Sequence, residues 1–398
     1  MEKLKVAILY GADAVYLGGE SFGLRSIAGN FSIDEMDEAL RLCHEKGVKA
    51  YLTVNSYPAD SLLDSLGLYL RQVSDLPFDA YIISDPGVLR MVRRITPERA
   101  VHLSTQANCI NHEAALFWQE QGVSRINLAR EMNIDEIRRT VKTSSIECEV
   151  FIHGALCVAY SGRCLISSVL TGRSANMGAC TQPCRWKYNL VEETRPGEFM
   201  PVEEDENGTL IFNSRDLCLL EYLPDLIEAG VASMKIEGRM KGVHYLAGVL
   251  RVYRAAIDSY CSDPSKYSTA PPWMEELTKV SHRGYTTGFL LGDPKDVGQF
   301  YENGYRRTHT IVGVVEDTPV GTDAVVAVRN RFRKGEFTEL LGPGMKTVSF
   351  CPETFSILNP DGTAEPSETA NPNQRIRVKL PESAEAGDLL RVTGHRAE

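Results

Sequence analysis

The sequence predicts an α/β fold: a TIM-like (β/α)8 barrel that lacks its first strand, followed by a small all-β C-terminal domain. Short runs of β-branched and aromatic residues alternate with amphipathic stretches from residue 14 to residue 261, as in parallel sheets covered by helices. A Pro- and Ser-rich segment at 262–273 marks a domain edge. Beyond it, strand-like runs follow one another with turns between them, as in small barrels and sandwiches.

The barrel region is expected to contain seven strands, at residues 14–19, 49–55, 79–85, 100–106, 125–130, 147–154 and 233–238. Helices are expected at 34–46, 60–75, 86–94, 111–121, 133–142 and 219–229, with 241–261 after the last strand. The helix at 34–46 opens with a capping box, in which the side chains of Ser32 and Glu35 each accept a hydrogen bond from the other's backbone N–H.

A complete barrel needs eight strands, and the stretch at 4–11 before the first one reads as a helix. We therefore expect the barrel either to lack its first strand or to be open at that seam. A doubly wound sheet is the alternative. No G-x-G-x-x-G follows any expected strand, so nucleotide binding of that kind is unsupported.

Three segments follow from this pattern. Residues 1–262 form the barrel, with a Cys-rich insertion at about 155–212, and residues 263–305 form a linker with a short helix near 273–281. Residues 306–398 form the all-β domain, with strands expected in THTIVGVVED, DAVVAVRNRF, GEFTELLGPG and RIRVKL.

Composition and charge exclude some classes of protein. The formal net charge of −10 argues against a protein that coats nucleic acid nonspecifically, although a local basic face is compatible with it. No apolar run is long enough to span a membrane, and the start of the chain lacks a secretory pattern. We expect a cytoplasmic protein with reduced thiols, in which clustered cysteines indicate metal binding or catalysis.

Four of the ten cysteines, Cys157, Cys164, Cys180 and Cys184, follow the strand at 147–154 with the spacing C-x6-C-x15-C-x3-C. The carboxyl ends of barrel strands form the active face, and thiolates select zinc, Cu(I) or iron–sulfur clusters. Only the second pair has the tight spacing of a zinc knuckle, so the spacing modestly favours a 4Fe–4S cluster over zinc. Cys218 competes with Cys184 as the fourth ligand.

Two other interpretations of the cysteines stay open. Cys157 and His153 could form a nucleophile–base pair of the thiol-hydrolase kind, although residues on one turn rarely do so. A buried cysteine can also be a small hydrophobic residue and nothing more.

Polar residues also gather where the expected strands end: Asn55, Asp85, Gln106, Asn108, Arg130, Glu131, His153, Glu237 and Arg239. Such a crowded set suggests an active face, although polar residues also end strands because loops begin there. No G-x-S-x-G elbow and no H-E-x-x-H helix occurs, which weakens a peptidase interpretation.

Residues 149–167, EVFIHGALCVAYSGRCLIS, closely resemble the defining motif of the collagenase-like peptidases of family U32. The resemblance continues through GACTQPCRWKY (178–188), NSRDLCLL (213–220), SMKIEGRMKGVHY (233–245) and VAVRNRFRKGEFTELLGPG (326–344), and so covers essentially the whole chain. Members of this family usually begin with a strand and a small turn that this chain lacks.

The resemblance implies one of two activities. Proteolysis is attributed to some members, and its substrates here would be unfolded or collagen-like polypeptides. Others resemble oxygen-independent hydroxylases with a four-cysteine 4Fe–4S cluster, which act in ubiquinone synthesis, on 23S rRNA cytidine, or on wobble uridine of tRNA to give 5-hydroxyuridine. The RNA branches are associated with prephenate, and this chain is most similar to the tRNA branch.

The same resemblance implies site residues. By position, Cys157, Cys164, Cys180 and Cys184 match the cluster ligands. Side chains alone cannot supply electrons, so hydroxylation of a ring carbon needs such a redox centre. His153 and Glu237 are the candidate catalytic residues, with His153 as a proton donor or acceptor beside the cluster.

The expected ligands are tRNA and a small dicarboxylate such as prephenate. Arg130 and Arg239 are candidates for clamping a carboxylate, and Gln106 is a further candidate for binding the substrate. The alternative for each arginine is an ion pair with neighbouring Glu131 or Glu237. A zinc-stapled RNA-binding module without enzymatic activity remains a third possibility.

The segment RNRFRKGE (329–336) is the candidate RNA-binding surface. It supplies Arg329, Arg331, Arg333 and Lys334 around Phe332, and basic side chains with an aromatic platform are typical of RNA recognition. The alternative is a charged solvent face on an exposed strand.

Overall fold

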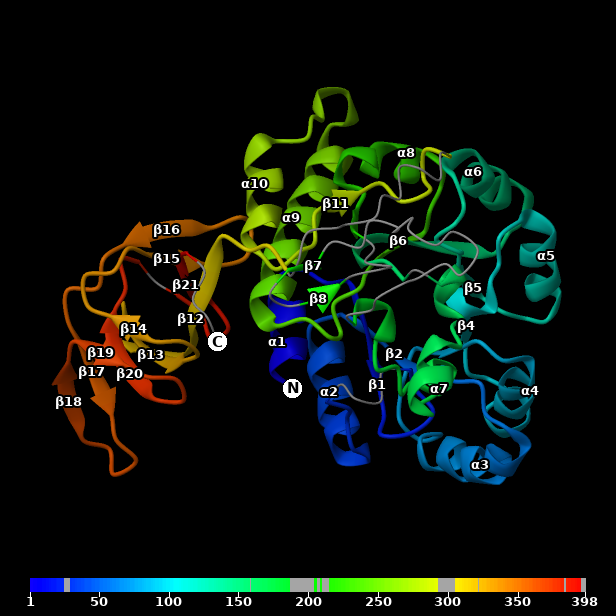
Figure 1. Cartoon of the computed structure of the whole chain (residues 1–398), viewed down its shortest axis with the longest axis horizontal. Coiled ribbons are helices and arrows are strands. Elements are labelled where there is room, and N and C mark those ends of the chain that lie inside the picture. Colours follow the sequence, from blue (N-terminus) through cyan, green and yellow to red (C-terminus); the bar gives the residue numbers. More distant parts are fainter. Residues whose placement is uncertain are drawn as a thin grey trace. The chain divides into compact units, whose positions relative to one another are not determined.

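The computed structural model describes residues 1–24, 29–157, 159–186, 204–205, 208–209, 215–292, 305–320, 322–382 and 384–394. The chain divides into two compact units (Figure 1). The α/β unit comprises Asp13–Met240 and His282–Tyr305, and the β-rich unit comprises Met1–Ala12, Lys241–Ser281 and Arg306–Glu398. No helix in the described ranges is long and apolar enough to cross a membrane.

The α/β unit is built on a parallel sheet that confirms all seven strands expected from the sequence. β1 to β6 pair in chain order, and β10 pairs with β6: β1 (Ala14–Gly18), β2 (Lys49–Val54), β3 (Ala80–Ile83), β4 (Val101–Leu103), β5 (Arg125–Asn127), β6 (Glu147–Ala155) and β10 (Ser233–Ile236). β3 and β4 are buried at every position, as parallel strands covered on both faces should be.

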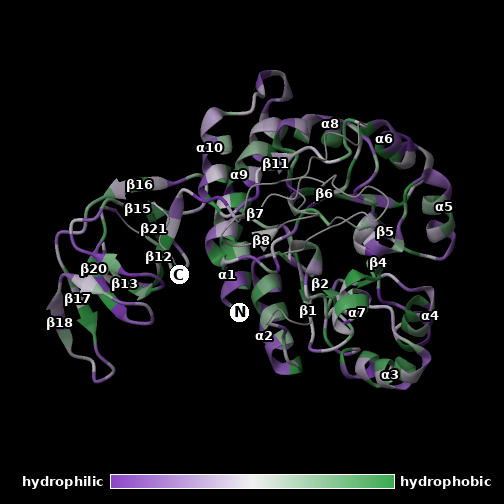
Figure 2. Ribbon diagram, in the orientation of Figure 1, coloured by the Kyte–Doolittle hydropathy of each residue, from purple (hydrophilic) through white to green (hydrophobic). Residues whose placement is uncertain are grey.

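The helices of this unit are α2 (Ile33–Glu45), α3 (Leu63–Gln72), α4 (Pro86–Ile95), α5 (His112–Glu120), α6 (Ile134–Thr143), α7 (Ile166–Thr171) and α8 (Leu223–Glu228). Local hydrogen bonds fix where several of them begin. The capping box expected at α2 is present, since Ser32 Oγ accepts from the Glu35 N–H and Glu35 Oε2 from the Ser32 N–H. Asp85 likewise caps α4, so its place at a strand end is structural. Polar and apolar residues interleave along these helices (Figure 2).

The sheet curls until side chains of β10 and of the residues after it reach β1. Lys235 Nζ lies 4.6 Å from the centre of the Tyr16 ring, and the Tyr16 hydroxyl lies 3.3 Å from Glu237 Oε2. No backbone ladder joins β10 to β1 in the described part of the chain. The structure therefore shows a curled parallel α/β sheet, and full closure into a barrel stays a prediction.

Three further features were not expected from the sequence. β9 (Asp216–Cys218) runs antiparallel to the end of β6, and β11 (Tyr285–Thr286) pairs with β9. β7 (Glu204–Asp205) and β8 (Gly208–Thr209) form a separate two-stranded ladder within the expected Cys-rich insertion. Much of that insertion, including residues 187–203, lies outside the described residues.

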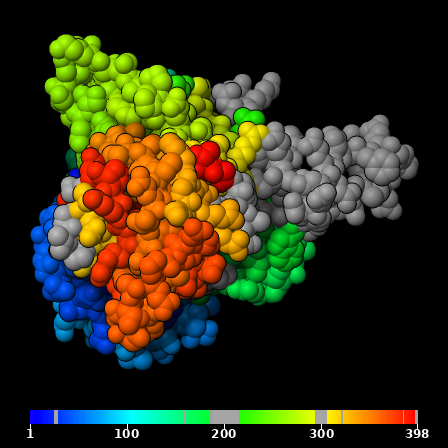
Figure 3. All heavy atoms as spheres, turned by 90° about the vertical axis from the view of Figure 1, so that its left-hand side faces the viewer, coloured from blue at the N-terminus to red at the C-terminus, as the bar shows by residue number. Residues whose placement is uncertain are grey.

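The β-rich unit contains the antiparallel sheet expected for the C-terminal domain. Its strands pair in the order β16-β15-β21-β12-β13-β20-β17-β18: β12 (His309–Val320), β13 (Asp323–Val328), β15 (Thr338–Leu341), β16 (Thr347–Phe350), β17 (Phe355–Leu358), β18 (Ala364–Ser367), β20 (Arg375–Lys379) and β21 (Leu389–Thr393). β14 (Phe332–Arg333) and β19 (Thr369–Ala370) form a small second ladder. Figure 3 shows this region as a contiguous yellow-to-red group of atoms.

The boundary between the units differs from the one expected at residue 262. The β-rich unit also holds α1 (Glu2–Leu9), α9 (Val243–Ser262) and α10 (Pro271–Lys279). The physical reason is a shared apolar core, formed by Val6, Tyr10, Ala247, Val314, Leu341 and Leu389. The Tyr10 hydroxyl also donates to the carbonyl of Leu341 at 3.0 Å. Strand and helix periodicity located these helices but could not assign them to a core.

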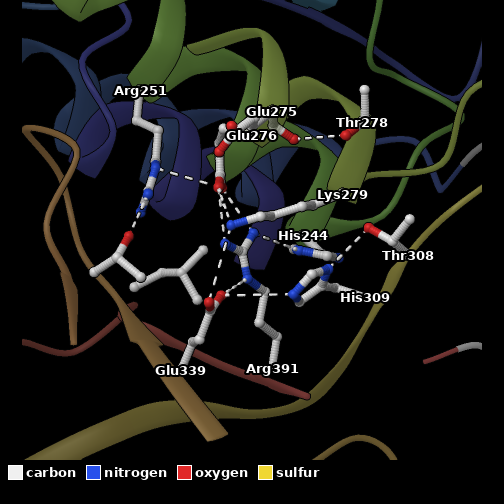
Figure 4. Close-up of polar contacts among 12 residues, drawn as sticks. His244, Arg251, Glu275, Glu276, Thr278, Lys279, Thr308, His309, Glu339 and Arg391 are labelled. Carbon is white, nitrogen blue, oxygen red and sulfur yellow. Dashed lines mark hydrogen bonds and ion pairs between the residues drawn. The ribbon is translucent and has the colours of Figure 1, made fainter. Parts of the chain in front are cut away.

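A buried ion network lies inside the β-rich unit (Figure 4). The fully buried Arg391 guanidinium donates to both carboxylate oxygens of Glu276, at 2.7 and 2.8 Å, and to Glu339 at 2.7 Å. Burial raises the pKa of Glu276, but the hydrogen bonds from Arg391 and the nearby Arg251 outweigh it and hold the pKa at about 2. Burial and Arg391 lower the pKa of His244 to about 3. At neutral pH Glu276 is therefore ionised and His244 is neutral.

Candidate functional site

A cavity of about 620 Å³ lies in the α/β unit at the carboxyl ends of the strands. Its wall brings together nine of the residues singled out from the sequence: Asn55, Gln106, Arg130, Cys157, Cys164, Cys180, Cys184, Glu237 and Arg239. They come from four strand ends and from the Cys-rich segment after β6. This is the face at which α/β sheets of this kind carry their active sites.

The four cysteines of the predicted cluster all line this one cavity. Cys157 is exposed, and the other three are half-buried. The backbone N–H of Gln182 donates to the sulfur of Cys180 at 3.4 Å. Among the described residues, however, no three Cys, His, Asp or Glu side chains converge closely enough to form a ready-made metal site. The donor set suits a cluster in kind, while the sulfurs would have to draw together around one.

Hydrogen bonds tether the cysteine segment to the strand ends. Ser161, which lies between Cys157 and Cys164, donates its backbone N–H and its hydroxyl to the Glu131 carboxylate, both at 2.6 Å. Arg163 donates to the carbonyl of Gln106 at 2.7 Å. The segment is thus held over the cavity by the loops that follow β4 and β5.

Cys218, the alternative fourth ligand, lies on β9 and is not among the residues that line the cavity. It stands opposite His153 in the register of β9 and β6. Cys184 is therefore the candidate that shares a cavity with the other three thiols.

His153 does not lie on the cavity wall, contrary to its expected place beside the cluster. Its side chain is buried, and its ring centre lies 5.2 Å from that of Tyr285 on β11. The cause is an irregularity in β6: Lys235 pairs with Phe151 but the next residue of β10 pairs with His153, so Ile152 is an extra residue. A bulge of this kind reverses the alternation of side chains beyond it.

The two candidate carboxylate clamps face the cavity from different strands. The Arg130 guanidinium stacks over the ring of Phe151, 4.0 Å from its centre, and donates to the carbonyl of Ala155 at 3.2 Å. Arg239 donates to the carbonyl of Leu24 at 2.6 Å and to the side chain of Asn30. The hydrogen bonds to these oxygens orient both guanidinium groups.

Gln106 belongs to a chain of polar side chains on the wall. Its Oε1 accepts from the Ser104 hydroxyl at 2.5 Å and from Asn55 Nδ2 at 3.4 Å. Asn55 Oδ1 in turn accepts from the backbone N–H of Leu24. These hydrogen bonds turn Oε1 of Gln106 toward the protein. The Nε2 amino group is therefore the part of the side chain that can donate to a ligand.

The floor of the cavity holds an ion pair that sequence reasoning missed. Lys235 Nζ lies 2.7 Å from Glu149 Oε1, and both side chains are more than nine-tenths buried. Burial raises the pKa of Glu149, but Lys235, Ser233 and Arg125 outweigh it and hold the pKa at about 2. Alternation could have found Lys235 but not its partner: in SMKIEG, Lys235 and Glu237 fall on one face of a strand.

The cavity is electropositive although the chain is acidic overall. Its described lining carries four cationic side chains and a single carboxylate, that of Glu237: Arg130, Arg173, Lys235 and Arg239. The whole chain has a formal net charge of −10. Clefts lined by one sign of charge concentrate ligands of the opposite sign, so this cavity suits an anionic ligand.

The expected RNA-binding segment lies in the β-rich unit, and one of its residues does not have the expected role. The ring of Phe332 is 1% exposed and packs on Phe355, so it cannot serve as a stacking platform for a base. Arg331 and Arg333 on either side of it are exposed. Arg329 pairs with Glu2, and Lys334 pairs with Glu368 at 3.3 Å. The alternation that exposes the basic residues is the same one that buries the aromatic ring.

Two family models and several relatives place the chain in the same protein family. The model of Peptidase family U32 matches residues 1–299, and that of the Peptidase family U32 C-terminal domain matches residues 307–391. "tRNA hydroxylation protein P1" of Bacillus subtilis is 39% identical over 98% of this chain and 92% of its own length. "tRNA hydroxylation protein P" of Escherichia coli is 37% identical over 86% of this chain and 84% of its own length. "Collagenase" of Porphyromonas gingivalis is 34% identical over 78% and 77%.

Proposed function

The chain belongs to peptidase family U32, and we propose that it is an RNA hydroxylase that converts wobble uridine of tRNA to 5-hydroxyuridine without oxygen. Two relatives named as tRNA hydroxylation proteins cover most of this chain and most of their own length, which supports RNA hydroxylation. The observation that carries the rest of the proposal is the gathering of Cys157, Cys164, Cys180 and Cys184 on the wall of one electropositive cavity.

In this proposal the four thiolates hold a 4Fe–4S cluster. When bound, the cluster supplies the electron transfer that protein side chains cannot perform. Reduced thiols require a reducing compartment, so we place the protein in the cytoplasm. Zinc on the same thiols is the alternative, and it would make the chain an RNA-binding module without redox chemistry.

The remaining roles belong to side chains of the cavity wall. Arg130 and Arg239 bind the carboxylates of a small dicarboxylate co-substrate, prephenate in the RNA branches of the family, because planar guanidinium groups bind carboxylates in pairs of hydrogen bonds. Gln106 presents its amide group to a ligand. Glu237, the one carboxylate among the described residues of the wall, is the candidate proton acceptor. His153, behind the wall, can act only through its neighbours.

The test combines metal content with the modified nucleoside. Protein purified without oxygen should contain about four iron atoms per chain, and Cys157→Ser, Cys164→Ser, Cys180→Ser or Cys184→Ser should each lower the iron content. Cys351→Ser is the matched control, because Cys351 is exposed like Cys157 but lies outside the cavity. Cys218→Ser decides the fourth ligand.

The same variants are then placed in a strain that lacks the gene and its redundant pathway. Wild type and Cys351→Ser should restore 5-hydroxyuridine in tRNA measured by nucleoside mass spectrometry, and the four cavity variants should not. Stoichiometric zinc instead of iron, or hydroxylation that survives loss of a cavity cysteine, would contradict the cluster.

A peptidase is the second candidate, favoured by the relative named as a collagenase. It predicts that protein stripped of metal cleaves gelatin, and that Cys157→Ala abolishes the cleavage. Gelatin that stays intact with wild-type protein excludes this candidate for that substrate.

A further inference from the structure

The floor of the cavity, the part lined by Asn127 and Lys235, contains one buried acceptor that no described residue satisfies. Asn127, at the end of β5, is 2% exposed and lines the cavity. Its Nδ2 donates to Glu149 Oε1 at 2.9 Å, which fixes the orientation of the amide. Its Oδ1 is buried and has no hydrogen-bond partner within the described ranges. A buried acceptor without a donor costs stability, so its retention points to a ligand that donates to it.

A donor stands beside this acceptor. Lys235 Nζ lies 2.7 Å from Glu149 Oε1, the same oxygen that binds Asn127 Nδ2. The ammonium and the amide are therefore neighbours on one carboxylate. An ammonium has three N–H groups and only one of them is needed for Glu149, so Lys235 can also donate into the cavity that it lines.

The charge at the floor favours a neutral ligand group over a carboxylate. Glu149 already neutralises Lys235, and a second carboxylate at the ammonium would face Glu149 across it. The aromatic rings of Tyr16 and Phe151 flank Lys235, with their centres 4.6 and 5.6 Å from Nζ. A flat, uncharged group that offers one carbonyl oxygen and one adjacent N–H matches this floor.

We propose that Asn127 and Lys235 read the pairing edge of a uracil-type base that is flipped out of the RNA, with Asn127 Oδ1 accepting from the ring N3–H and Lys235 donating to the adjacent carbonyl oxygen. Glu149 and Ser233 are positioning residues: Glu149 holds both readers, and the Ser233 hydroxyl donates to Glu149 Oε2 at 2.8 Å. Enzymes that act on a base commonly extrude it and read this edge in a pocket. The inference rests on the proposed function and names the recognition residues of the same cavity.

The test measures binding rather than turnover. The probe is a synthetic anticodon stem-loop RNA with uridine at the wobble position, compared with the same RNA carrying 3-methyluridine there, and affinity is measured by fluorescence anisotropy on the full chain. Methylation removes the N3–H and should weaken binding to wild-type protein about tenfold, because it leaves Asn127 Oδ1 unpaired. This arm needs no variant and so does not depend on how a variant folds.

Variants then assign the effect to residues. Asn127→Leu should bind the unmodified RNA about tenfold more weakly and should no longer distinguish it from the methylated RNA. Lys235→Met should also weaken binding, while keeping the preference for the unmodified base. Ser124→Ala is the matched control, because it also removes one side-chain hydrogen bond, to the carbonyl of Val101 at 3.0 Å, but Ser124 does not line the cavity, and it should bind both RNAs like wild type.

The outcomes separate the two proposals. Failure of wild-type protein to bind any anticodon stem-loop contradicts the proposed function itself. Tight binding with equal affinity for the two RNAs overturns only the assignment of the floor. Binding of prephenate alone that Lys235→Met abolishes, with RNA discrimination unchanged, would show that the floor holds a small organic acid and would also overturn it.

Discussion

Replacement of Arg391 by Met tests whether the buried ion network holds the β-rich unit together. The guanidinium is fully buried and makes three hydrogen bonds to two carboxylates. Without it, the cations that remain beside Glu276 in the described part of the chain are Arg251 at 3.5 Å and Lys279 at 3.7 Å, and the Glu276 side chain is 3% exposed. Removal of one member of a buried ion pair typically costs about 3–5 kcal/mol, since the other charge stays buried without compensation. We expect a loss of that size in the free energy of unfolding of this unit.

Hydrogen exchange measured by mass spectrometry localises the effect. Peptides from α10 and β15 report on the β-rich unit, and peptides from β3 in the α/β unit serve as an internal reference. Arg375→Met is the matched control, because Arg375 also pairs with a carboxylate at 2.6 Å but is 59% exposed. Exposed pairs contribute at most about 1 kcal/mol. If Arg391→Met accelerates exchange no more than Arg375→Met does, burial of the network does not stabilise this unit.

Two further predictions concern other buried side chains. Phe332→Ala should destabilise the β-rich unit by about 3–5 kcal/mol in urea unfolding, because the ring is in the core. The same variant should leave RNA affinity unchanged under conditions in which it is folded. Weaker RNA binding with an unchanged unfolding midpoint would show instead that the ring stacks on a base. In the folded protein the pKa of Glu149 is about 2, below its ordinary 4.5. Its contribution of about 3 kcal/mol to the free energy of unfolding is therefore present above pH 4.5 and is lost as the pH falls toward 2. Glu149→Gln should therefore be less stable than wild type at pH 7, and urea titrations should show that the difference shrinks between pH 4.5 and pH 2.

Sequence periodicity was sufficient to predict where the parallel strands and most of the helices lie. β2, β3 and β6 are runs of residues buried at nearly every position, and runs of that kind are visible without coordinates. The capping box at Ser32 and Glu35 is equally local. Short strands such as β9 and β19 were missed because two or three residues carry no period.

The candidate site was predictable in part. The position of a residue at the carboxyl end of a strand was enough to bring Gln106, Arg130 and Arg239 to one cavity. The same rule failed to place His153, because a single extra residue in β6 turns its side chain away from the cavity. The pattern of residue types does not reveal such a bulge.

By itself the sequence determined the seven longer parallel strands and most of the helices, which family the chain resembles, and which thiols are grouped along the chain. Only the tertiary structure decided that α1 and α9 share a core with the C-terminal strands. It also decided that Phe332 is buried and that Lys235 and Asn127 meet on Glu149. The physical reason is that local propensity and periodicity act over neighbouring residues, whereas burial and ion pairing depend on groups that are far apart in the chain. A buried charge such as Glu149 is stable only where such distant partners meet it, and no local pattern specifies that meeting.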